Sequence, residues 1–380
     1  MSKIMKKVLI VSDVPTSPVV AGNRVCISAY SSLLKSFCDV YFLYISPVNN
    51  NEDYQETAKE WDGHFFFHKV DALQNKLNGL VYKHKSLYNV LGVDFFYPWF
   101  LCRKVRKLQE KYSFDGIIIN YIWLSKIANG LDGVPIILFT HDVFTFRNKK
   151  LGYSHWITCT PNEEAKCINR VDYVLAIQEK ECNYYQYLSY KSKVFTVYTP
   201  FFPAMQSITL NKNILFFSGD NDLNVVCMKR FATYIMPYLS NHLPGLVLHI
   251  GGKICYKLER YPEFVNKTNI VLHGIFRSPE DFYRLGDIVV NPVNEGTGLK
   301  IKTFEAISYG KTVIASHHSI DGVFNKSEIP VYIAEAKEDY LNIIKRCLCN
   351  KDELKKNQLK AISWLNSLNG YIAGVFKSII

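Results

Sequence analysis

One stretch near the C-terminal third of the chain combines a buried strand, a glycine-containing turn, a helix and a second strand. The first strand lies within 287–292, and the turn after it contains Gly296 and Gly298. Because glycine has no Cβ, backbone N–H groups in this turn can approach a ligand closely. The helix is predicted to begin near Leu299 and to end at Gly310, a residue type common just after helices. This order of elements predicts part of a parallel sheet with a ligand-binding turn.

The first turn of this helix carries two lysines, and a glutamate follows on the same face. Lys300 and Lys302 lie where the helix dipole is already positive, so they are unfavourable there unless an anion is bound. Helix N-termini bind phosphates well. Glu305 is three residues after Lys302, and a cation beside a carboxylate suits a phosphate next to a ribose. The alternative is that both lysines are solvated and that Glu305 pairs with Lys302.

Short apolar runs alternate with helical stretches along almost the whole chain. Most runs are continuous, as expected for strands covered on both faces, and the alternation predicts parallel, doubly wound sheets. In the first half the predicted strands are 8–12, 40–45, 64–69, 116–120, 136–140, 173–177 and 194–198. In the second half they are 214–218, 246–251, 270–273, 288–291, 312–315 and 331–334.

The alternation stops around 198–203, where two prolines indicate a linker, and then restarts. We therefore predict two Rossmann-like domains, 1–199 and 200–366, and a strongly apolar C-terminal helix, 367–380, that packs back on the first domain. Ligands of such sheets bind beyond the carboxyl ends of the strands. Two facing domains are then expected to form a cleft lined by the residues that follow the strands.

Composition favours a globular protein without a transmembrane helix. Hydrophobic residues make up 48% and charged residues 21% of the 380 residues, and no apolar stretch is long enough to span a membrane. The start, MSKIMKKVLIVSD, has too short an apolar run for a signal segment, and Asp13 interrupts it. The ten cysteines lack the spacing of zinc ligands, which favours a reducing, cytoplasmic environment and no metal site.

The net charge of +11 permits an acidic partner. Lysines and arginines are spread through the chain, and we expect no nucleic-acid partner. Their densest group lies within 83–111, on both sides of the aromatic run 95–100. Basic residues interleaved with Trp and Phe are typical of a peripheral membrane contact. The alternative is a helix whose aromatic residues pack inward and whose lysines are solvated.

On these residues the chain resembles the GT-B glycosyltransferases, specifically glycosyltransferase family four. The similarity is strongest over 216–323, through FFSGDNDLNV, LVLHIGG, NIVLHG and GTGLKIKTFEAISYGKTVIAS. It is weaker in the first half, through SDVPTSPVVAGNR, FTHD and DYVLAIQEKE. The resemblance implies an α/β fold of GT-B type, with two facing Rossmann-like domains. The N-terminal domain would bind the acceptor and the C-terminal domain the nucleotide-sugar donor.

The glutamate pair of this family, Glu-x7-Glu, is only half present. Glu305 corresponds to the second glutamate, which holds the ribose hydroxyls in the family, whereas Thr297 stands in place of the first. The family often has a basic pair after the first strand of its C-terminal domain, but here that loop is Asp-Asn-Asp at 220–222. Phosphate binding is therefore expected to depend on Lys302, Lys300 and the helix N-terminus.

The resemblance also implies roles for single residues. Lys302, Glu305 and His141 are the predicted catalytic residues, with His141 contacting the sugar or its phosphate. The predicted donor-binding residues are Gly22, Asn23, Arg24, Gly219, His273, Gly274, Arg277, Gly296, Thr297, Gly298, Leu299 and Lys300. The alternatives are turn glycines, solvated arginines at Arg24 and Arg277, and a structural histidine at His141.

The implied activity is sugar transfer, with retention of configuration, from a UDP- or GDP-linked donor to a glycan or lipid-linked saccharide, in cell-envelope polysaccharide synthesis. No cofactor and no metal are expected, because positive protein groups would stabilise the diphosphate leaving group. We expect a cytoplasmic protein at the inner face of the cytoplasmic membrane. An epimerase or phosphorylase acting on nucleotide sugars and a non-catalytic membrane-associated scaffold are the alternatives.

Overall fold

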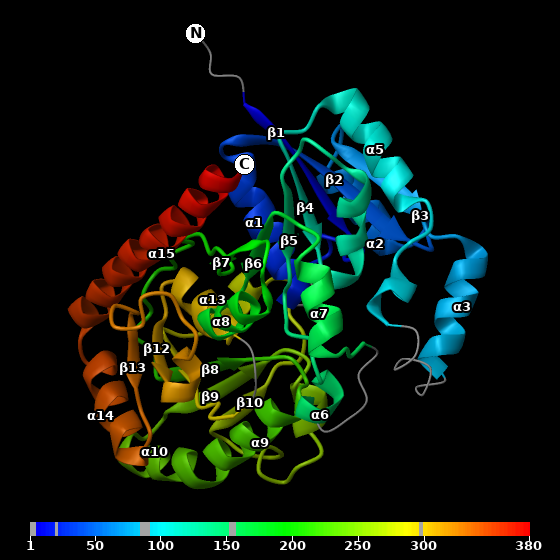
Figure 1. Ribbon diagram of the computed structural model, residues 1–380. Helices are drawn as coiled ribbons and strands as arrows, with labels where there is room; N and C mark the ends of the chain where they lie inside the picture. The colour runs from blue at the N-terminus through cyan, green and yellow to red at the C-terminus, as the bar shows by residue number, and fades with distance from the viewer. Residues whose placement is uncertain (1–4, 20–21, 84–91, 152–156, 296–298) are drawn as a thin grey trace. The chain divides into compact units, whose positions relative to one another are not determined.

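The computed structural model describes residues 5–19, 22–83, 92–151, 157–295 and 299–380, which divide into two units (Figure 1). Unit 1 comprises Met1–Pro200 together with Tyr371–Ile380, and unit 2 comprises Phe201–Gly370. Each unit has its own parallel sheet, and each is described by itself.

Unit 1 is built on a seven-stranded parallel sheet with the order β3-β2-β1-β4-β5-β6-β7. The strands are β1 (Lys6–Ser12), β2 (Cys38–Ser46), β3 (Phe65–Lys69), β4 (Gly116–Asn120), β5 (Ile136–Phe139), β6 (Tyr173–Ala176) and β7 (Lys193–Thr196). Strand order reverses between β1 and β4, which is the topological switch point where doubly wound sheets bind ligands.

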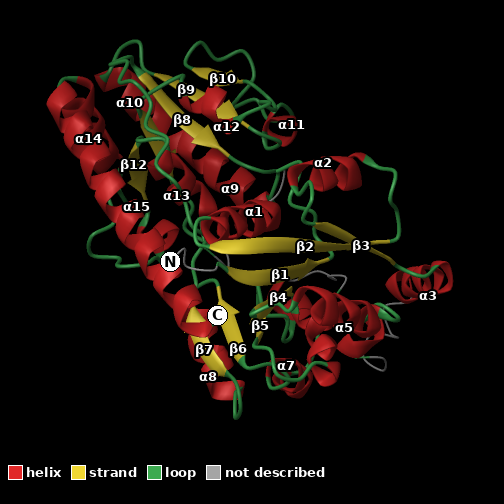
Figure 2. Cartoon of the chain, turned by 90° about the horizontal axis from the view of Figure 1, so that it is seen from above, coloured by secondary structure: helices red, strands yellow, loops and turns green. Residues whose placement is uncertain are grey.

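Helices cover both faces of this sheet, as Figure 2 shows for α1 and α2 on one side and α5 and α7 on the other. The helical elements are α1 (Gly22–Lys35), α2 (Glu52–Glu60), α3 (Ala72–Lys83), η2 (Val93–Phe96), α5 (Leu101–Tyr112), η3 (Ile122–Gly130), α6 (Arg147–Leu151), α7 (Pro161–Ile168) and α8 (Glu179–Leu188). Alternate residues of a strand point to opposite faces. In β1, Leu9 and Val11 join the core under α5 and η3.

Unit 2 is built on a six-stranded parallel sheet with the order β10-β9-β8-β11-β12-β13. The strands are β8 (Asn213–Phe217), β9 (Val247–Gly251), β10 (Ile270–Leu272), β11 (Ile288–Asn291), β12 (Thr312–Ala315) and β13 (Val331–Ile333). Here the order reverses between β8 and β11, so unit 2 has a switch point of its own.

The helices of unit 2 also pack on both sheet faces. They are α9 (Asp222–Arg230), the π-helix η4 (Phe231–Ile235), α10 (Met236–His242), α11 (Cys255–Leu258), α12 (Pro279–Tyr283), α13 (Ile301–Ser308), η5 (His317–Ile320), α14 (Lys337–Leu348) and the part of α15 (Lys351–Ile379) up to Gly370. Met228 of α9, Leu239 of α10 and Ile344 of α14 share one core with the sheet. On the other face, the ring of Phe282 lies 5.0 Å from that of Phe217.

The last turns of α15 pack within unit 1. The hydroxyl of Tyr371 donates to the carbonyl of Thr196 at 3.0 Å. The ring of Phe376 lies 6.1 Å from that of Tyr30 in α1. These contacts bring the chain end against residues near its start. None of the helices in the described ranges is long and apolar enough to cross a membrane.

All thirteen predicted strands are present, and their ends differ from the prediction by at most two residues. Continuous apolar runs predicted them well because both faces of each sheet are covered. The doubly wound α/β fold is therefore confirmed for each unit, whereas the cleft between facing domains stays a prediction.

Candidate active site

Two side chains meet across the switch point of unit 2. Lys302, in the first turn of α13, donates a hydrogen bond from Nζ to Oδ1 of Asn224 at 2.7 Å. Asn224 lies in the first turn of α9, the helix that follows β8. The same Nζ lies 4.7 Å from the ring centroid of Phe216. The lysine is thus held at the edge where ligands of such sheets bind.

Lys302 is half-buried and lacks a carboxylate partner within the described ranges. Burial is the main cause that lowers its pKa, to about 7, and the charge of Lys300 lowers it further. Cys227 raises the pKa of Lys302. A half-buried ammonium group without a counter-charge is costly. A bound anion would remove that cost.

Glu305, one turn further along α13, has a different partner. Its Oε2 accepts a hydrogen bond from the hydroxyl of Tyr283 at 3.0 Å. Tyr283 is fully buried, and its ring stacks on that of Tyr309 at 4.8 Å. Burial raises the pKa of Glu305 to about 7. Glu305 and Lys302 each bind a neutral partner, so the alternative of a mutual ion pair is wrong for the described side chains.

The start of α13 differs from the prediction. The helix begins at Ile301, because Lys300 has a non-helical ψ of 75° and occupies the N-cap position. Only Lys302 therefore lies in the first turn. The half-buried Leu299 precedes Lys300, and the carbonyl of Leu299 accepts a hydrogen bond from the N–H of Ile301. Gly296, Thr297 and Gly298 lie outside the described residues.

Buried hydrogen bonds tie α13 to the strand before it. Asn291, the last residue of β11, donates from Nδ2 to Oγ1 of Thr303 at 2.8 Å. Thr303 in turn donates to the carbonyl of Ser319, which follows β12. At the other end, Gly310 has a φ of +73°, as expected for the glycine that ends this helix.

Backbone hydrogen bonds join the carboxyl ends of three neighbouring strands. The N–H of Ser218 donates to the carbonyl of Gly251 at 3.0 Å, and the N–H of Gly252 donates to the carbonyl of Gly274 at 2.7 Å. A Cβ on Gly252 would lie 2.2 Å from the carbonyl oxygen of Ser218, so only glycine fits there. Gly219, which follows Ser218 in the chain, is exposed, with open space around its α-carbon.

Of the two predicted polar residues after β10, one has a side-chain partner. His273 Nε2 lies 2.8 Å from Nδ1 of His249 in β9, and burial lowers the pKa of both imidazoles. Arg277 is exposed, and no hydrogen bond joins its guanidinium to the rest of the described chain. The predicted contact of Arg277 with the donor therefore stays a prediction.

His141 lies in unit 1, two residues after β5, and is only 8% exposed. Its Nε2 is 2.7 Å from Oδ1 of Asn120, the last residue of β4. Burial lowers the pKa of His141 to about 3, so the imidazole is neutral at neutral pH. A neutral imidazole offers a sugar hydroxyl a hydrogen bond but offers a phosphate no charge.

The predicted residues at the start of α1 also have partners in unit 1. Gly22 is the first residue of α1, and Asn23 donates from Nδ2 to the hydroxyl of Tyr121 at 3.1 Å. Arg24 binds both carboxylate oxygens of Asp53, at 2.7 and 3.0 Å. Unlike Lys302, Arg24 therefore has its charge compensated.

Sequence reasoning missed two residues of the unit 2 site, Asn224 and Tyr283. Asn224 is a polar residue in the first turn of the helix after β8, and it lies within the FFSGDNDLNV stretch. That position could have identified it. Tyr283 carries no local signal, because an aromatic residue in a short helix usually belongs to the core.

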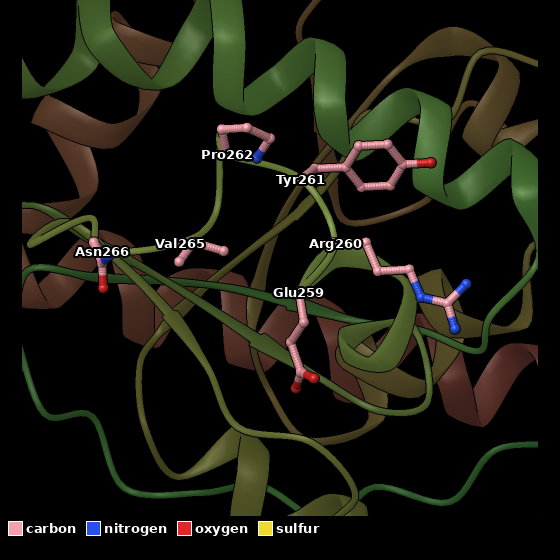
Figure 3. A pocket seen from close by; sticks show the side chains of 6 residues that line it. All are labelled: Glu259, Arg260, Tyr261, Pro262, Val265 and Asn266. Carbon is pink, nitrogen blue, oxygen red and sulfur yellow. The ribbon is translucent and has the colours of Figure 1, made fainter.

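A separate pocket of about 340 Å³ is lined by Glu259, Arg260, Tyr261, Pro262, Val265 and Asn266 (Figure 3). These residues lie between α11 and the start of β10, on the amino side of that strand. None of the residues that line this pocket is a predicted site residue. Within the described ranges, no group of three or more His, Cys, Asp or Glu side chains could hold a metal ion.

Comparison with known proteins links this geometry to one family. Residues 211–350 match the model of a family described as "Glycosyl transferases group 1". No curated protein sequence matches the chain significantly. The matched range contains all six strands of unit 2 and the Lys302–Glu305 helix.

Solved structures match nearly the whole chain at low identity. HepE of Anabaena in complex with UDP has a TM-score of 0.65 and 12% identity over 98% of this chain and 100% of its own. A glycosyltransferase from Rickettsia africae has a TM-score of 0.62 and 15% identity over 99% of both chains. Sucrose-phosphate synthase from Thermosynechococcus elongatus has a TM-score of 0.62 and 14% identity over 98% of both chains. Residues 211–350 therefore match the model of the group 1 glycosyltransferases, and the fold of the chain is that of the GT-B glycosyltransferase structures it matches.

Proposed function

We propose that this protein transfers a sugar from a nucleoside-diphosphate sugar to a hydroxyl group of a glycan or lipid-linked saccharide. The family match and the fold support a glycosyltransferase. The observation that carries the proposal is Lys302, a half-buried amine with a pKa near 7 at the switch point of unit 2. A diphosphate bound there supplies the missing negative charge and returns the amine to its ammonium form.

The two charged residues of α13 have separate tasks in this proposal. Lys302 stabilises the charge that grows on the leaving diphosphate as the bond to the anomeric carbon breaks. Glu305, oriented by Tyr283, accepts hydrogen bonds from the ribose hydroxyls. HepE of Anabaena forms complexes with UDP and with UDP-glucose, which supports a uridine nucleotide, and a guanosine nucleotide is the alternative.

Transfer proceeds with retention of configuration and without a metal. The anomeric carbon loses its bond to the diphosphate oxygen and gains one to the acceptor oxygen. The acceptor proton moves to the leaving phosphate oxygen on the same face of the sugar, so no protein base is required. The neutral imidazole of His141 contacts a sugar hydroxyl rather than a phosphate.

A peripheral membrane contact completes the proposal and places the acceptor at an anionic lipid surface. Within 83–111, Trp99 and Phe100 are exposed, Phe100 to 71%, whereas Phe96 is buried. Arg103 and Lys107 are exposed on α5 beside them. Apolar side chains flanked by basic residues suit an anionic interface. Lys85 lies outside the described residues.

The helix α3 extends this surface beyond the predicted range. Leu73, Leu77 and Leu80 are spaced to share one face of α3, and all three are exposed. Both Figure 1 and Figure 2 show α3 standing out from the rest of unit 1. Gln74 anchors the helix by donating to the carbonyl of Tyr97 and accepting from the N–H of Trp99. We call Leu73, Leu77, Leu80, Trp99 and Phe100 the apolar ridge.

Calorimetry with UDP and GDP, followed by turnover of the matching nucleotide sugars, tests the proposed function. One nucleotide should bind, and Lys302→Ala should lower turnover by orders of magnitude, whereas Lys267→Ala, an exposed lysine of unit 2, should behave as wild type. An epimerase would instead release an isomeric nucleotide sugar without any acceptor. A scaffold would bind neither nucleotide. Normal turnover in Lys302→Ala would refute the assignment.

A further inference from the structure

A hydrogen bond also spans the switch point of unit 1. Asp13 is the first residue after β1, and its Oδ2 accepts from Nε1–H of Trp123 in η3, just after β4, at 2.8 Å. The other carboxylate oxygen, Oδ1, is buried and has no hydrogen-bond partner within the described ranges. A buried carboxylate oxygen without a donor is costly. Such an oxygen at a switch point calls for a donor that a ligand would bring.

The backbone at the ends of β4 and β5 is strained at this place. Tyr121 has φ +72° and ψ 149°, a region that is essentially restricted to glycine, and His141 has φ +62°. The ring of Tyr121 lies 4.4 Å from that of Trp123 and 4.6 Å from that of His141. Strain of this kind concentrates at binding sites. The aromatic stack therefore links Asp13 to His141 in one cluster.

The hydrogen bonds of Asn120 fix the proton position on His141. Asn120 donates from Nδ2 to the carbonyl of Val11 at 3.1 Å, so its Oδ1 is the acceptor for both Tyr30 and His141. The imidazole must then carry its proton on Nε2, which leaves a lone pair on Nδ1. At neutral pH, Nδ1 of His141 can only accept a hydrogen bond.

We propose that Asp13 binds a hydroxyl group of the acceptor at the carboxyl ends of β1, β4 and β5. Asp13 Oδ1 and His141 Nδ1 are both acceptors, so the ligand that fits brings hydrogen-bond donors. A sugar or another polyol does so. A phosphate does not, and the carboxylate repels it, since the nearby Arg24 is already paired with Asp53. This inference rests on the proposed function, because it names a residue that binds the acceptor of that reaction.

The charge state of Asp13 changes near physiological pH. Burial raises its pKa to about 6, against the effects of the hydrogen bond from Trp123 and of the backbone N–H of Asp13 itself. The phenols of Tyr44, Tyr82 and Tyr121, which interact with it, all have raised pKa values. They stay neutral between pH 5 and 8, as does His141. Binding of a hydroxyl donor should strengthen as the pH rises through about 6, because the carboxylate is the better acceptor.

A second carboxyl group, Glu181 on α8, also titrates near this range. Burial raises the pKa of Glu181 to about 7, and Asp142 raises it further. Arg147, which pairs with Asp142, lowers it. The variant Asp13→Asn separates the two groups, because it removes the titration of Asp13 and leaves that of Glu181.

The test uses the full chain and methyl glycosides of glucose, galactose, mannose and N-acetylglucosamine, with saturation-transfer NMR in the presence and absence of UDP. At least one glycoside should bind the wild type. Asp13→Asn should weaken it by about tenfold, since a charge-assisted hydrogen bond becomes a neutral one, and should remove the step near pH 6. Asp39→Asn, which alters a carboxylate at the amino end of β2 bonded to His64, should match wild type.

Three outcomes would overturn the inference: equal glycoside affinity in wild type and Asp13→Asn, no glycoside binding to wild type, or displacement of the glycoside by inorganic phosphate. Asparagine keeps an oxygen for the N–H of Trp123, and melting curves of both variants check that they fold. UDP titration separates the two proposals. If the wild type binds no nucleotide, the proposed function is refuted. If UDP binds and Asp13→Asn leaves glycoside binding unchanged, only this inference is refuted.

Discussion

Lys302 donates to Asn224 across the point where the strand order of unit 2 reverses. The two residues are 78 positions apart in the chain, and each lies in the first turn of the helix that follows its strand. Asn224 thereby fixes the ammonium group at the sheet edge without compensating its charge. A carboxylate at the same place would compensate that charge and compete with a bound anion.

This arrangement predicts effects of different size for two substitutions of Asn224. Asn224→Ala should weaken UDP binding by about tenfold, because Lys302 loses the group that holds it in position. Asn224→Asp should weaken binding more than alanine does, because the new carboxylate pairs with Lys302 and repels the diphosphate. Calorimetry with UDP measures both. Tighter binding in Asn224→Asp than in Asn224→Ala would show that the lysine is not the phosphate ligand.

The sequence predicts the strands and the local motif well, but not the partners that hold the motif. Lys302 and Glu305 can be identified from the spacing of residues within one predicted helix. Asn224 meets Lys302 through the pairing of β8 with β11, and Tyr283 meets Glu305 through the packing of α12. The position of Asn224 marks it as a candidate residue, but no local pattern shows that it contacts Lys302, and none identifies Tyr283. The sequence places Lys300 in the first helical turn, whereas it is the N-cap residue, for a related reason. The helix starts where the loop geometry allows, and propensity defines that position only to within a few residues.

Proton uptake should accompany UDP binding at about pH 8. Burial lowers the pKa of Lys302 to about 7, so the free amine is mostly neutral at that pH, and the diphosphate favours its charged form. Glu305, with a pKa of about 7, is already mostly ionised there and contributes little. Calorimetry in buffers of different ionisation enthalpy measures the uptake. It should disappear in Lys302→Ala, and its persistence there would mean that another group takes up the proton.

Glu305→Gln should make the protein more stable and less active. The folded pKa of Glu305 is raised to about 7 from 4.5, so the folded state holds its proton more tightly than the unfolded state. Its contribution to stability is therefore lost as the pH rises from 4.5 through 7. Glutamine should recover at most about 3 kcal/mol at pH 8 and nothing near pH 4.

Melting temperatures of wild type and Glu305→Gln at the two pH values test this difference. The variant should also bind UDP more weakly, since a neutral amide is a poorer acceptor for the ribose hydroxyls than a carboxylate. Equal stability at pH 8 would show that the Glu305 carboxylate is not penalised in the folded protein. Unchanged UDP affinity would remove Glu305 from the ribose site.

The apolar ridge should bind membranes that carry negative charge. Leu73→Asn with Leu80→Asn removes two side chains that are 58% and 52% exposed, and we expect co-sedimentation with phosphatidylglycerol vesicles to fall by about tenfold or more. Arg103→Gln with Lys107→Gln should weaken binding by roughly 1 kcal/mol per charge. Phosphatidylcholine vesicles should bind the wild type weakly.

A matched control is Leu359→Asn, which changes a leucine that is 68% exposed on α15, in unit 2. It should leave vesicle binding as in wild type. Because the ridge leucines are exposed, their substitution should also leave the melting temperature and UDP affinity unchanged, so a loss of vesicle binding cannot be attributed to unfolding. If the ridge variant sediments with anionic vesicles as wild type does, the lipid surface is not the partner of α3, and the acceptor must be sought among soluble glycans.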